Sequence, residues 1–241
     1  MCDVETDGRP DPDPMDPMGD TPAARAARFC KLGNFCVSAP LIWHGVHAAE
    51  PILSIARHFL GDDLVLKFNT VFVKPARTGS ETPWHQDNGV WRDGETDPFN
   101  FWMALDPSTR SNGCLQFVPG SHTGDIIQHV LYEDGIHAEL PRDLVKDTLS
   151  RGAVAHVELK PGDIVCWHSS AWHHSPPNTS DQGRIGVAGV YTTPAIIQRR
   201  NRGWPNYRWA MKGGKVVTTF PPEVYPDDGR ETKPATPFPK L

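Results

Sequence analysis

Residues 82–91 (TPWHQDNGVW) place His85 and Asp87 one residue apart, directly after the apolar residues 64–75 (LVLKFNTVFVKP). Residues two apart in a β-strand point to the same side, so we expect the imidazole and the carboxylate to lie side by side. Two histidines and one carboxylate form a ligand set for non-haem iron that leaves the remaining metal positions open. The segment thus offers two of three ligands, although alone it is also typical of a surface-loop histidine beside a solvated aspartate.

A second segment, residues 162–187 (GDIVCWHSSAWHHSPPNTSDQGRIGV), offers the third ligand. It contains His168, His173 and His174, and each of them is able to complete the set with His85 and Asp87. Alternatively, His168 is a core histidine that is hydrogen-bonded to the backbone.

The same segment carries groups suited to a carboxylate. His173 and Ser175 share one face if the chain is extended there. A turn at residues 178–179 would bring Arg184 level with His173 on the following strand, where a guanidinium can hold a carboxylate through two parallel hydrogen bonds. The alternative is that Arg184 is an ordinary solvent-exposed charge.

Short apolar or alternating segments must position these residues. They recur at residues 64–73, 99–105, 114–120, 153–159, 163–169 and 185–193. Turn sequences such as RSNG, KPGD and PPNTSDQG separate them, which favours a β-sandwich or barrel over βαβ units. The fold class that we expect is mainly β with flanking helices.

The rest of the chain is expected to flank this core. Residues 21–33, with Thr21 as N-cap, and residues 47–61, ended by Gly61, predict two helices. The polar residues 124–153 are expected to cross the mouth of the site. We expect residues 1–20 to be a disordered tail and residues 21–241 a single domain, with a helical flank to about 61, a core at about 62–195 and an irregular part at about 196–241.

Composition excludes several functional classes. The chain has 241 residues, 38% hydrophobic and 22% charged, which indicates a globular protein with a full core. A net charge of −5 without a dense basic stripe argues against nucleic acid as partner. The apolar runs are too short for a membrane span. Five scattered cysteines without a CxxC pair, and an acidic N-terminus unlike a signal peptide, favour a reducing cytoplasm. We expect a monomer or homodimer that acts on a small molecule.

Three segments together resemble the phytanoyl-CoA dioxygenase family, a branch of the Fe(II)/2-oxoglutarate-dependent oxygenases. They are FVKPARTGSETPWHQD, FWMALDPSTRSNGCLQFVPGSH and GDIVCWHSSAWHHSPPNTSDQGR, in the family's order. In the family the distal histidine is followed by Ser two residues later, a Pro-Asn turn and Arg eleven residues later. His173, Ser175 and Arg184 fill those places, while His174 stands where the family usually has Gly.

The resemblance implies a double-stranded β-helix, a jelly-roll with the metal on its inner face. It implies His85, Asp87 and His173 as catalytic iron ligands, with 2-oxoglutarate and O2 as co-substrates. Arg184 and Ser175 carry over as binders of the far carboxylate of 2-oxoglutarate. Trp102 and Thr70 carry over as residues beside the co-substrate.

The expected function is therefore Fe(II)/2-oxoglutarate-dependent oxidation of an unactivated C–H bond in a small molecule, with hydroxylation in secondary metabolism as the outcome. Trp91 and Trp204 are candidate substrate contacts, because aromatic faces suit sugar-like or polycyclic molecules. The alternatives are oxidative ring closure of an oligosaccharide antibiotic and hydroxylation of an acyl-CoA. A degenerate jelly-roll binding protein and a metal-dependent hydrolase or cupin-type isomerase also remain open.

Overall fold

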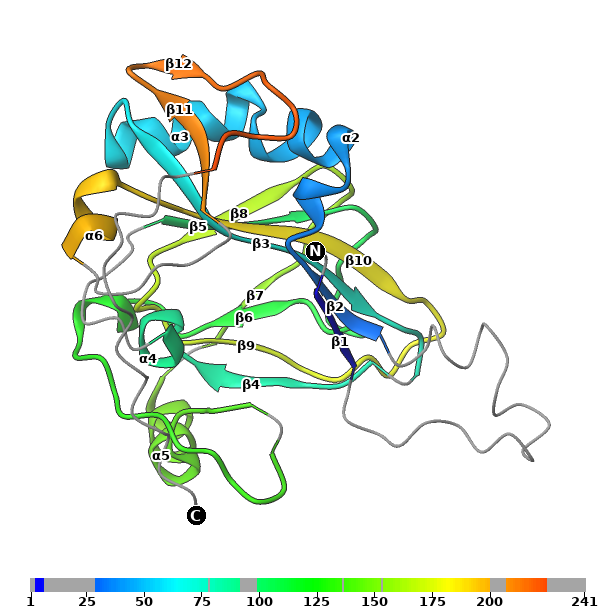
Figure 1. Ribbon diagram of the computed structural model, residues 1–241. Helices are drawn as coiled ribbons and strands as arrows, with labels where there is room; N and C mark the ends of the chain where they lie inside the picture. The colour runs from blue at the N-terminus through cyan, green and yellow to red at the C-terminus, as the bar shows by residue number, and fades with distance from the viewer. Residues whose placement is uncertain are drawn as a thin grey trace.

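Two antiparallel β-sheets face each other and form the body of the protein (Figure 1). The computed structural model describes residues 3–6, 29–77, 79–91, 99–135, 137–152, 154–199 and 207–224. The apolar and alternating segments of the sequence form the strands, so each strand turns one set of side chains inward and the other outward.

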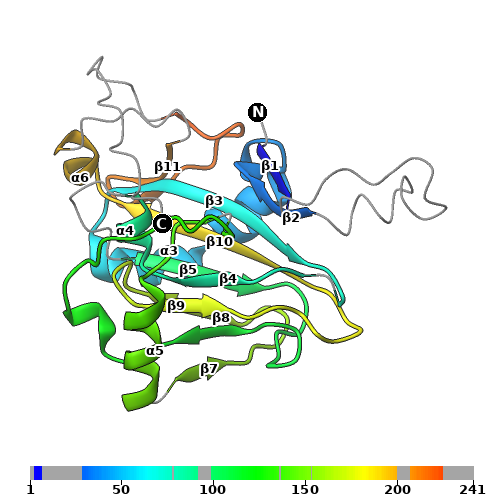
Figure 2. The same ribbon diagram turned by 90° about the horizontal axis from the view of Figure 1, so that it is seen from below.

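The larger sheet has the central strand order β3-β10-β5-β8. These strands span Leu64–Lys74 (β3), Arg184–Thr192 (β10), Phe99–Ala104 (β5) and Ile164–Trp167 (β8). Beyond β3 the sheet continues with β2 (Phe29–Gly33) and β1 (Asp3–Thr6), seen beside β3 in Figure 2. A hairpin of β11 (Arg208–Lys212) and β12 (Lys215–Val216) also pairs with β3.

The smaller sheet has the order β4-β9-β6-β7. Its strands span Thr82–His85 (β4), His173–Ser175 (β9), Leu115–Phe117 (β6) and Ala155–Val157 (β7). Between β3 and β10 the chain passes back and forth between the two sheets, and only β6 and β7 follow each other in the same sheet. This winding is the expected double-stranded β-helix.

Helices cover the outer face of the larger sheet. They are η1 (Phe35–Val37), α2 (Pro40–Ile42), the π-helical turn η2 (Trp43–His47) and α3 (Glu50–Leu60). α3 buries Leu53 and Ala56 against Phe101 and Tyr191 of the sheet. It ends at Gly61, whose φ of 87° only glycine adopts without strain, as the sequence predicted.

A second apolar layer lies on the outer face of the smaller sheet. Trp84, Leu140 and Trp172 pack there against one side of α5 (Arg142–Arg151), which lies below this sheet in Figure 1. α5 therefore covers the back of the smaller sheet, whereas we expected residues 124–153 to cross the mouth of the site. The remaining short helices are α4 (Asp87–Trp91), η3 (Ser121–Thr123) and α6 (Pro194–Arg199).

One predicted helix is wrong where it can be compared with the structure. Phe29–Gly33, expected at the end of a helix over residues 21–33, forms β2 and pairs with β3 from Lys31 opposite Phe72 onward. Residues 21–28 lie outside the described part. β1 falls within the segment expected to be a tail, and β11 within the part expected to be irregular.

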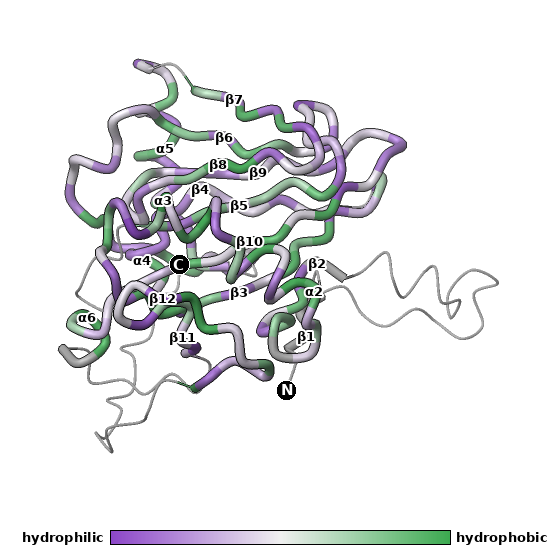
Figure 3. Tube along the Cα trace, turned by 90° about the horizontal axis from the view of Figure 1, so that it is seen from above, coloured by the Kyte–Doolittle hydropathy of each residue, from purple (hydrophilic) through white to green (hydrophobic). Residues whose placement is uncertain are grey.

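Hydropathy follows this layered arrangement. In Figure 3 hydrophobic stretches run along β10 and β5, and many of the connecting turns are hydrophilic. No helix in the described ranges is both long enough and apolar enough to cross a membrane.

Candidate active site

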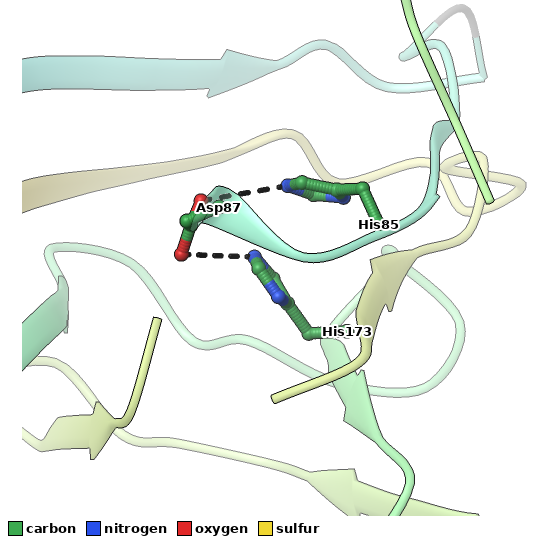
Figure 4. Close-up of side chains that lie close together, drawn as sticks. All are labelled: His85, Asp87 and His173. Carbon is green, nitrogen blue, oxygen red and sulfur yellow. Dashed lines mark ion pairs between the residues drawn. The ribbon is translucent and has the colours of Figure 1, made fainter. Parts of the chain in front are cut away.

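His85, Asp87 and His173 meet between the two sheets (Figure 4). His85 ends β4 and lies directly opposite His173, which begins β9, while Asp87 begins α4. The Nε2 atoms of His85 and His173 lie 3.7 Å from Oδ1 and Oδ2 of Asp87 respectively. One ligand atom from each residue lies within 4.8 Å of the other two, so the residues chosen from the sequence come together as a group that could hold one metal ion.

Backbone carbonyls fix the orientation of both imidazole rings. Nδ1 of His85 is 2.8 Å from the carbonyl oxygen of Pro83, and Nδ1 of His173 is 3.0 Å from that of Ala171. A carbonyl oxygen only accepts, so each Nδ1 carries the proton and donates it. This leaves Nε2 of each ring toward Asp87, as the nitrogen that can offer a lone pair to a metal.

The charge state of the group also suits a divalent cation. Burial, followed by the neighbouring His85, lowers the pKa of His173 to about 4, so its ring is neutral near pH 7. Burial acts to raise the pKa of Asp87, but the two histidines and the indole N–H of Trp167, which donates to Oδ2 at 3.0 Å, bring it below its ordinary value. With His85, these residues supply two imidazole nitrogens and one carboxylate, a donor set that fits Fe(II).

Arg184 lies at another part of the same cavity. Its Nη2 donates to Oγ of Ser175 at 2.9 Å, and its Nη2 and Nε donate to the carbonyl oxygen of Gly113 at 2.6 and 3.2 Å. The guanidinium carbon lies 5.0 Å from the ring centre of Trp102. Only 3% of Arg184 is exposed, and this burial lowers its pKa to about 10, which still leaves it charged at neutral pH.

The route by which Arg184 reaches Ser175 differs from the sequence prediction. We expected β10 to return beside β9, with Arg184 level with His173. Instead β9 belongs to the smaller sheet and β10 to the larger one, between β3 and β5. Arg184 and Ser175 therefore meet across the space between the sheets.

Two further residues belong to the Arg184 region, and the sequence did not predict either of them as a site residue. Lys74, buried at the end of β3, donates from Nζ to the carbonyl oxygens of Ser175 and Pro176 at 3.1 and 2.5 Å. Gly113 has a φ of 84°, and a Cβ there would lie 2.4 Å from the carbonyl oxygen of Pro176. The SNG sequence signalled a tight turn, but nothing local indicated that its carbonyl would accept from Arg184 and Ser175.

A cavity of about 240 Å³ contains both groups. Its other lining residues include aromatic side chains from the larger sheet and from α4, namely Phe68, Phe72, Trp91, Trp102 and Trp167. Trp91, predicted as a substrate contact, is part of this lining. Thr70 is buried in register with Ala188 and Trp102 but is not part of the lining, and Trp204 lies outside the described residues.

The other two candidate histidines are engaged elsewhere. The ring of His174 stacks on Trp84 with ring centres 4.9 Å apart, and its Nε2 lies 2.6 Å from Oε1 of Glu81. His168 accepts a hydrogen bond at Nδ1 from the backbone N–H of Ser170. Neither residue joins the possible metal group found in the described part of the chain.

Comparisons with known proteins agree with this arrangement. The chain is 29% identical over 179 residues to the probable alpha-ketoglutarate-dependent hypophosphite dioxygenase of Stutzerimonas stutzeri, covering 72% of this chain and 60% of that protein. The structure of ThoJ, a non-heme monooxygenase, superposes with a TM-score of 0.56 at 29% identity, covering 72% of this chain and 62% of that one.

EvdO2 from Micromonospora carbonacea var. aurantiaca, solved in complex with 2-oxoglutarate, superposes with a TM-score of 0.58 at 25% identity, covering 72% of this chain and 71% of that one. The chain spans between about half and two thirds of the length of the curated relatives that it matches. The family model "Phytanoyl-CoA dioxygenase (PhyH)" matches residues 15–186, and this chain therefore belongs to the phytanoyl-CoA dioxygenase family.

Proposed function

We propose that this protein is an Fe(II)- and 2-oxoglutarate-dependent dioxygenase that oxidises a C–H bond of a small molecule. The observation that carries the proposal is that a three-ligand metal group and a buried, hydrogen-bonded arginine line one cavity. The first group suits Fe(II) and the second suits a carboxylate. A co-substrate with a metal-binding end and a distant carboxylate would join the two, and 2-oxoglutarate has that form.

His85, Asp87 and His173 would hold the iron, and the far carboxylate of 2-oxoglutarate would lie on Arg184 and Ser175. Iron with bound 2-oxoglutarate supplies the activation of O2 for oxidation of the substrate, while 2-oxoglutarate becomes succinate and CO2. The protein positions the reactants and excludes water. Trp102, packed against the guanidinium, and Phe72 supply apolar cover around the co-substrate.

Hydroxylation is the outcome that we propose for the substrate. The carboxylate of Asp87 occupies the third ligand place, and the apolar walls of the cavity suit a substrate held against the metal by shape. The S. stutzeri relative is named for a small substrate, hypophosphite. This supports a small free substrate over an acyl-CoA. Ring closure of an oligosaccharide antibiotic would use the same site and differ only in the product.

The test is 2-oxoglutarate turnover by protein loaded anaerobically with Fe(II). Succinate should form on admission of O2, with ascorbate present, and a metabolite that is a substrate should raise the rate. The matched control is Asp87→Ala, which removes the charged ligand. If iron-loaded wild-type protein formed no more succinate than Asp87→Ala, the chain would instead be a jelly-roll binding protein.

A further inference from the structure

The inner face of the larger sheet is organised in transverse rows of residues that are cross-strand partners. One row crosses β3, β10, β5 and β8 and consists of Thr70, Ala188, Trp102 and Val165. The next row, two residues along each strand and farther from Arg184, consists of Phe68, Val190, Asn100 and Trp167. Two residues of a strand advance by roughly 6.6 Å. Val190 of the second row follows Arg184 by six residues on β10, so this row lies roughly 20 Å along the strand from Arg184.

The second row is the one associated with the metal group. Trp167 donates its indole N–H to Asp87, and its ring centre is 5.2 Å from that of His173. Asn100 is the direct cross-strand partner of Trp167. The cavity beyond the co-substrate groups is therefore lined by this row, together with Trp91, whose ring centre lies 6.2 Å from that of Phe68.

Asn100 has an amide oxygen without a hydrogen-bond partner in the described part of the chain. The residue is 1% exposed, and its Nδ2 donates to Oγ of Ser169 at 2.6 Å, while no donor reaches Oδ1. A buried carbonyl oxygen without a partner is destabilising, because it loses its hydrogen bonds to water on folding and forms none within the protein. His47, Ser108 and Thr192 also carry such atoms, but they lie outside the cavity lining, which includes Asn100.

The position of Asn100 is fixed relative to the metal group. Ser169 accepts from the side-chain amide of Asn100 at its Oγ. The backbone carbonyl oxygen of Ser169 also accepts the backbone N–H of Asn88 at 3.1 Å, and Asn88 directly follows Asp87. The side chain of Asn88 donates to Oγ of Ser170 at 3.1 Å. One turn, residues 169–170, thus connects Asn100 to the helix that begins with the metal ligand Asp87.

We propose that Asn100 determines substrate specificity by accepting a hydrogen bond at Oδ1 from a hydroxyl or N–H group of the substrate. This inference rests on the proposed function. It narrows the substrate class to molecules that carry a hydrogen-bond donor near the oxidised carbon, such as polyols, glycosides or amino alcohols. A plain hydrocarbon chain would leave the buried amide oxygen unpaired, and a site of this kind discriminates strongly against such a substrate.

The first test compares Fe(II)-loaded wild-type protein with Asn100→Leu, which keeps the approximate shape of the side chain and removes the acceptor. The probes are methyl glycosides, cyclitols and amino alcohols, each supplied with its deoxy and O-methyl counterparts, and the readout is stimulation of succinate formation. Wild-type protein should prefer the free hydroxyl or amine by about 10- to 100-fold over both counterparts. In Asn100→Leu this preference should fall to within about threefold.

Ser108→Ala is the matched control, because Ser108 also has a buried oxygen without a partner among the described residues but does not line the cavity. It should keep the wild-type preference. An unchanged preference in Asn100→Leu would overturn the proposal, and so would a rise in the KM for 2-oxoglutarate without a change in preference, which would assign Asn100 to the co-substrate. Failure of the proposed function would look different, since the wild-type protein would then form no succinate.

A second test needs no substrate. The double variant Asn100→Leu, Ser169→Ala removes both partners of the single hydrogen bond together with the unpaired oxygen. If Oδ1 is unsatisfied in the free protein, the melting temperature should equal or exceed that of the wild type. A decrease of several degrees would mean that the amide is already satisfied without substrate, and would overturn the proposal.

Discussion

The metal-ligand end and the Arg184 end of the cavity use the same kind of group, a backbone carbonyl, to opposite effect. At His85 and His173 a carbonyl two residues earlier accepts the ring proton, so the other nitrogen offers a lone pair. At Arg184 and Ser175 the carbonyl of Gly113 accepts from both side chains, and the guanidinium keeps further N–H groups. One end thus offers electron pairs, which suit a cation, and the other offers N–H donors, which suit an anion.

A third histidine shows that the local pattern alone does not make a ligand. His129 also donates from Nδ1 to the carbonyl two residues earlier, that of Ile127, at 2.8 Å. Its Nε2, however, accepts the backbone N–H of Gln86 at 3.0 Å. A lone pair that already accepts an N–H cannot bind a metal at the same time. The difference between His129 and His85 therefore lies in what the second nitrogen faces.

The largest effect expected is at the metal-ligand end. His85→Ala, Asp87→Ala and His173→Ala should each reduce Fe(II) binding and succinate formation to background, because two remaining ligands cannot hold the ion. Iron content after anaerobic loading and gel filtration measures this. His129→Asn serves as the control and should retain iron; loss of iron there equal to that in His85→Ala would contradict the distinction between the histidines.

At the other end, Arg184→Ala should raise the KM for 2-oxoglutarate by about a hundredfold or more. The reason is that the variant loses a buried, charge-assisted contact, which typically contributes about 2–5 kcal/mol. Initial rates over a range of 2-oxoglutarate concentrations would measure it. Arg184→Lys should recover only part of the affinity, since one ammonium cannot reproduce the planar fork. An unchanged KM for 2-oxoglutarate in Arg184→Ala would mean that the carboxylate of 2-oxoglutarate does not bind at Arg184.

Trp167→Phe should weaken Fe(II) binding by about 10- to 100-fold, the usual range when a hydrogen-bond partner of a metal ligand is lost. The substitution keeps an aromatic ring beside His173 but removes the indole N–H that orients Asp87. Competition with a metal-sensitive dye would give the affinity. Trp172→Phe, on the outer face of the smaller sheet, is the matched control and should change the affinity by less than about twofold.

The smallest effect should come from His174→Gln. His174 stacks on Trp84 and pairs with the half-exposed Glu81, and partly exposed pairs of this kind typically contribute no more than about 1 kcal/mol. Iron affinity and the KM for 2-oxoglutarate should both stay within about fivefold of the wild-type values. A complete loss of iron would mean that His174, rather than its neighbour, is the third ligand.

Alternation along the chain predicted most of the core. β3, β5 and β10 are long and apolar enough for their period to be visible. The spacing of His85 and Asp87 marked them as a possible ligand pair, whereas the choice of His173 came from the resemblance to the phytanoyl-CoA dioxygenase family. β2 was missed because Phe29–Gly33 follows an Ala- and Arg-rich stretch that favours a helix locally, whereas pairing with β3 decides the structure. β11 has no clear alternation and is a strand because it pairs with β3 and turns back through β12.

The supporting residues could not be predicted, because their partners are far away in the sequence. Gly113 and Arg184 are 71 residues apart, and Trp167 and Asp87 are 80 residues apart. A tight-turn sequence and a tryptophan in a strand are both ordinary, and neither indicates which side chain will approach. The prediction of His173 over His174 depended on the family's spacing to Ser175 and Arg184, and the structure places those two residues in contact.

The carbonyl of Gly113 also has a consequence for the entropy of binding. An arginine side chain carries about 2 kcal/mol of rotamer entropy when it is free, and a ligand that orders it must offset that cost. Arg184 already loses this freedom on folding, because its Nε and Nη2 are held by Gly113 and its plane rests near Trp102. A carboxylate arriving at this end therefore meets a guanidinium that is already ordered, and more of the energy of the contact remains as affinity.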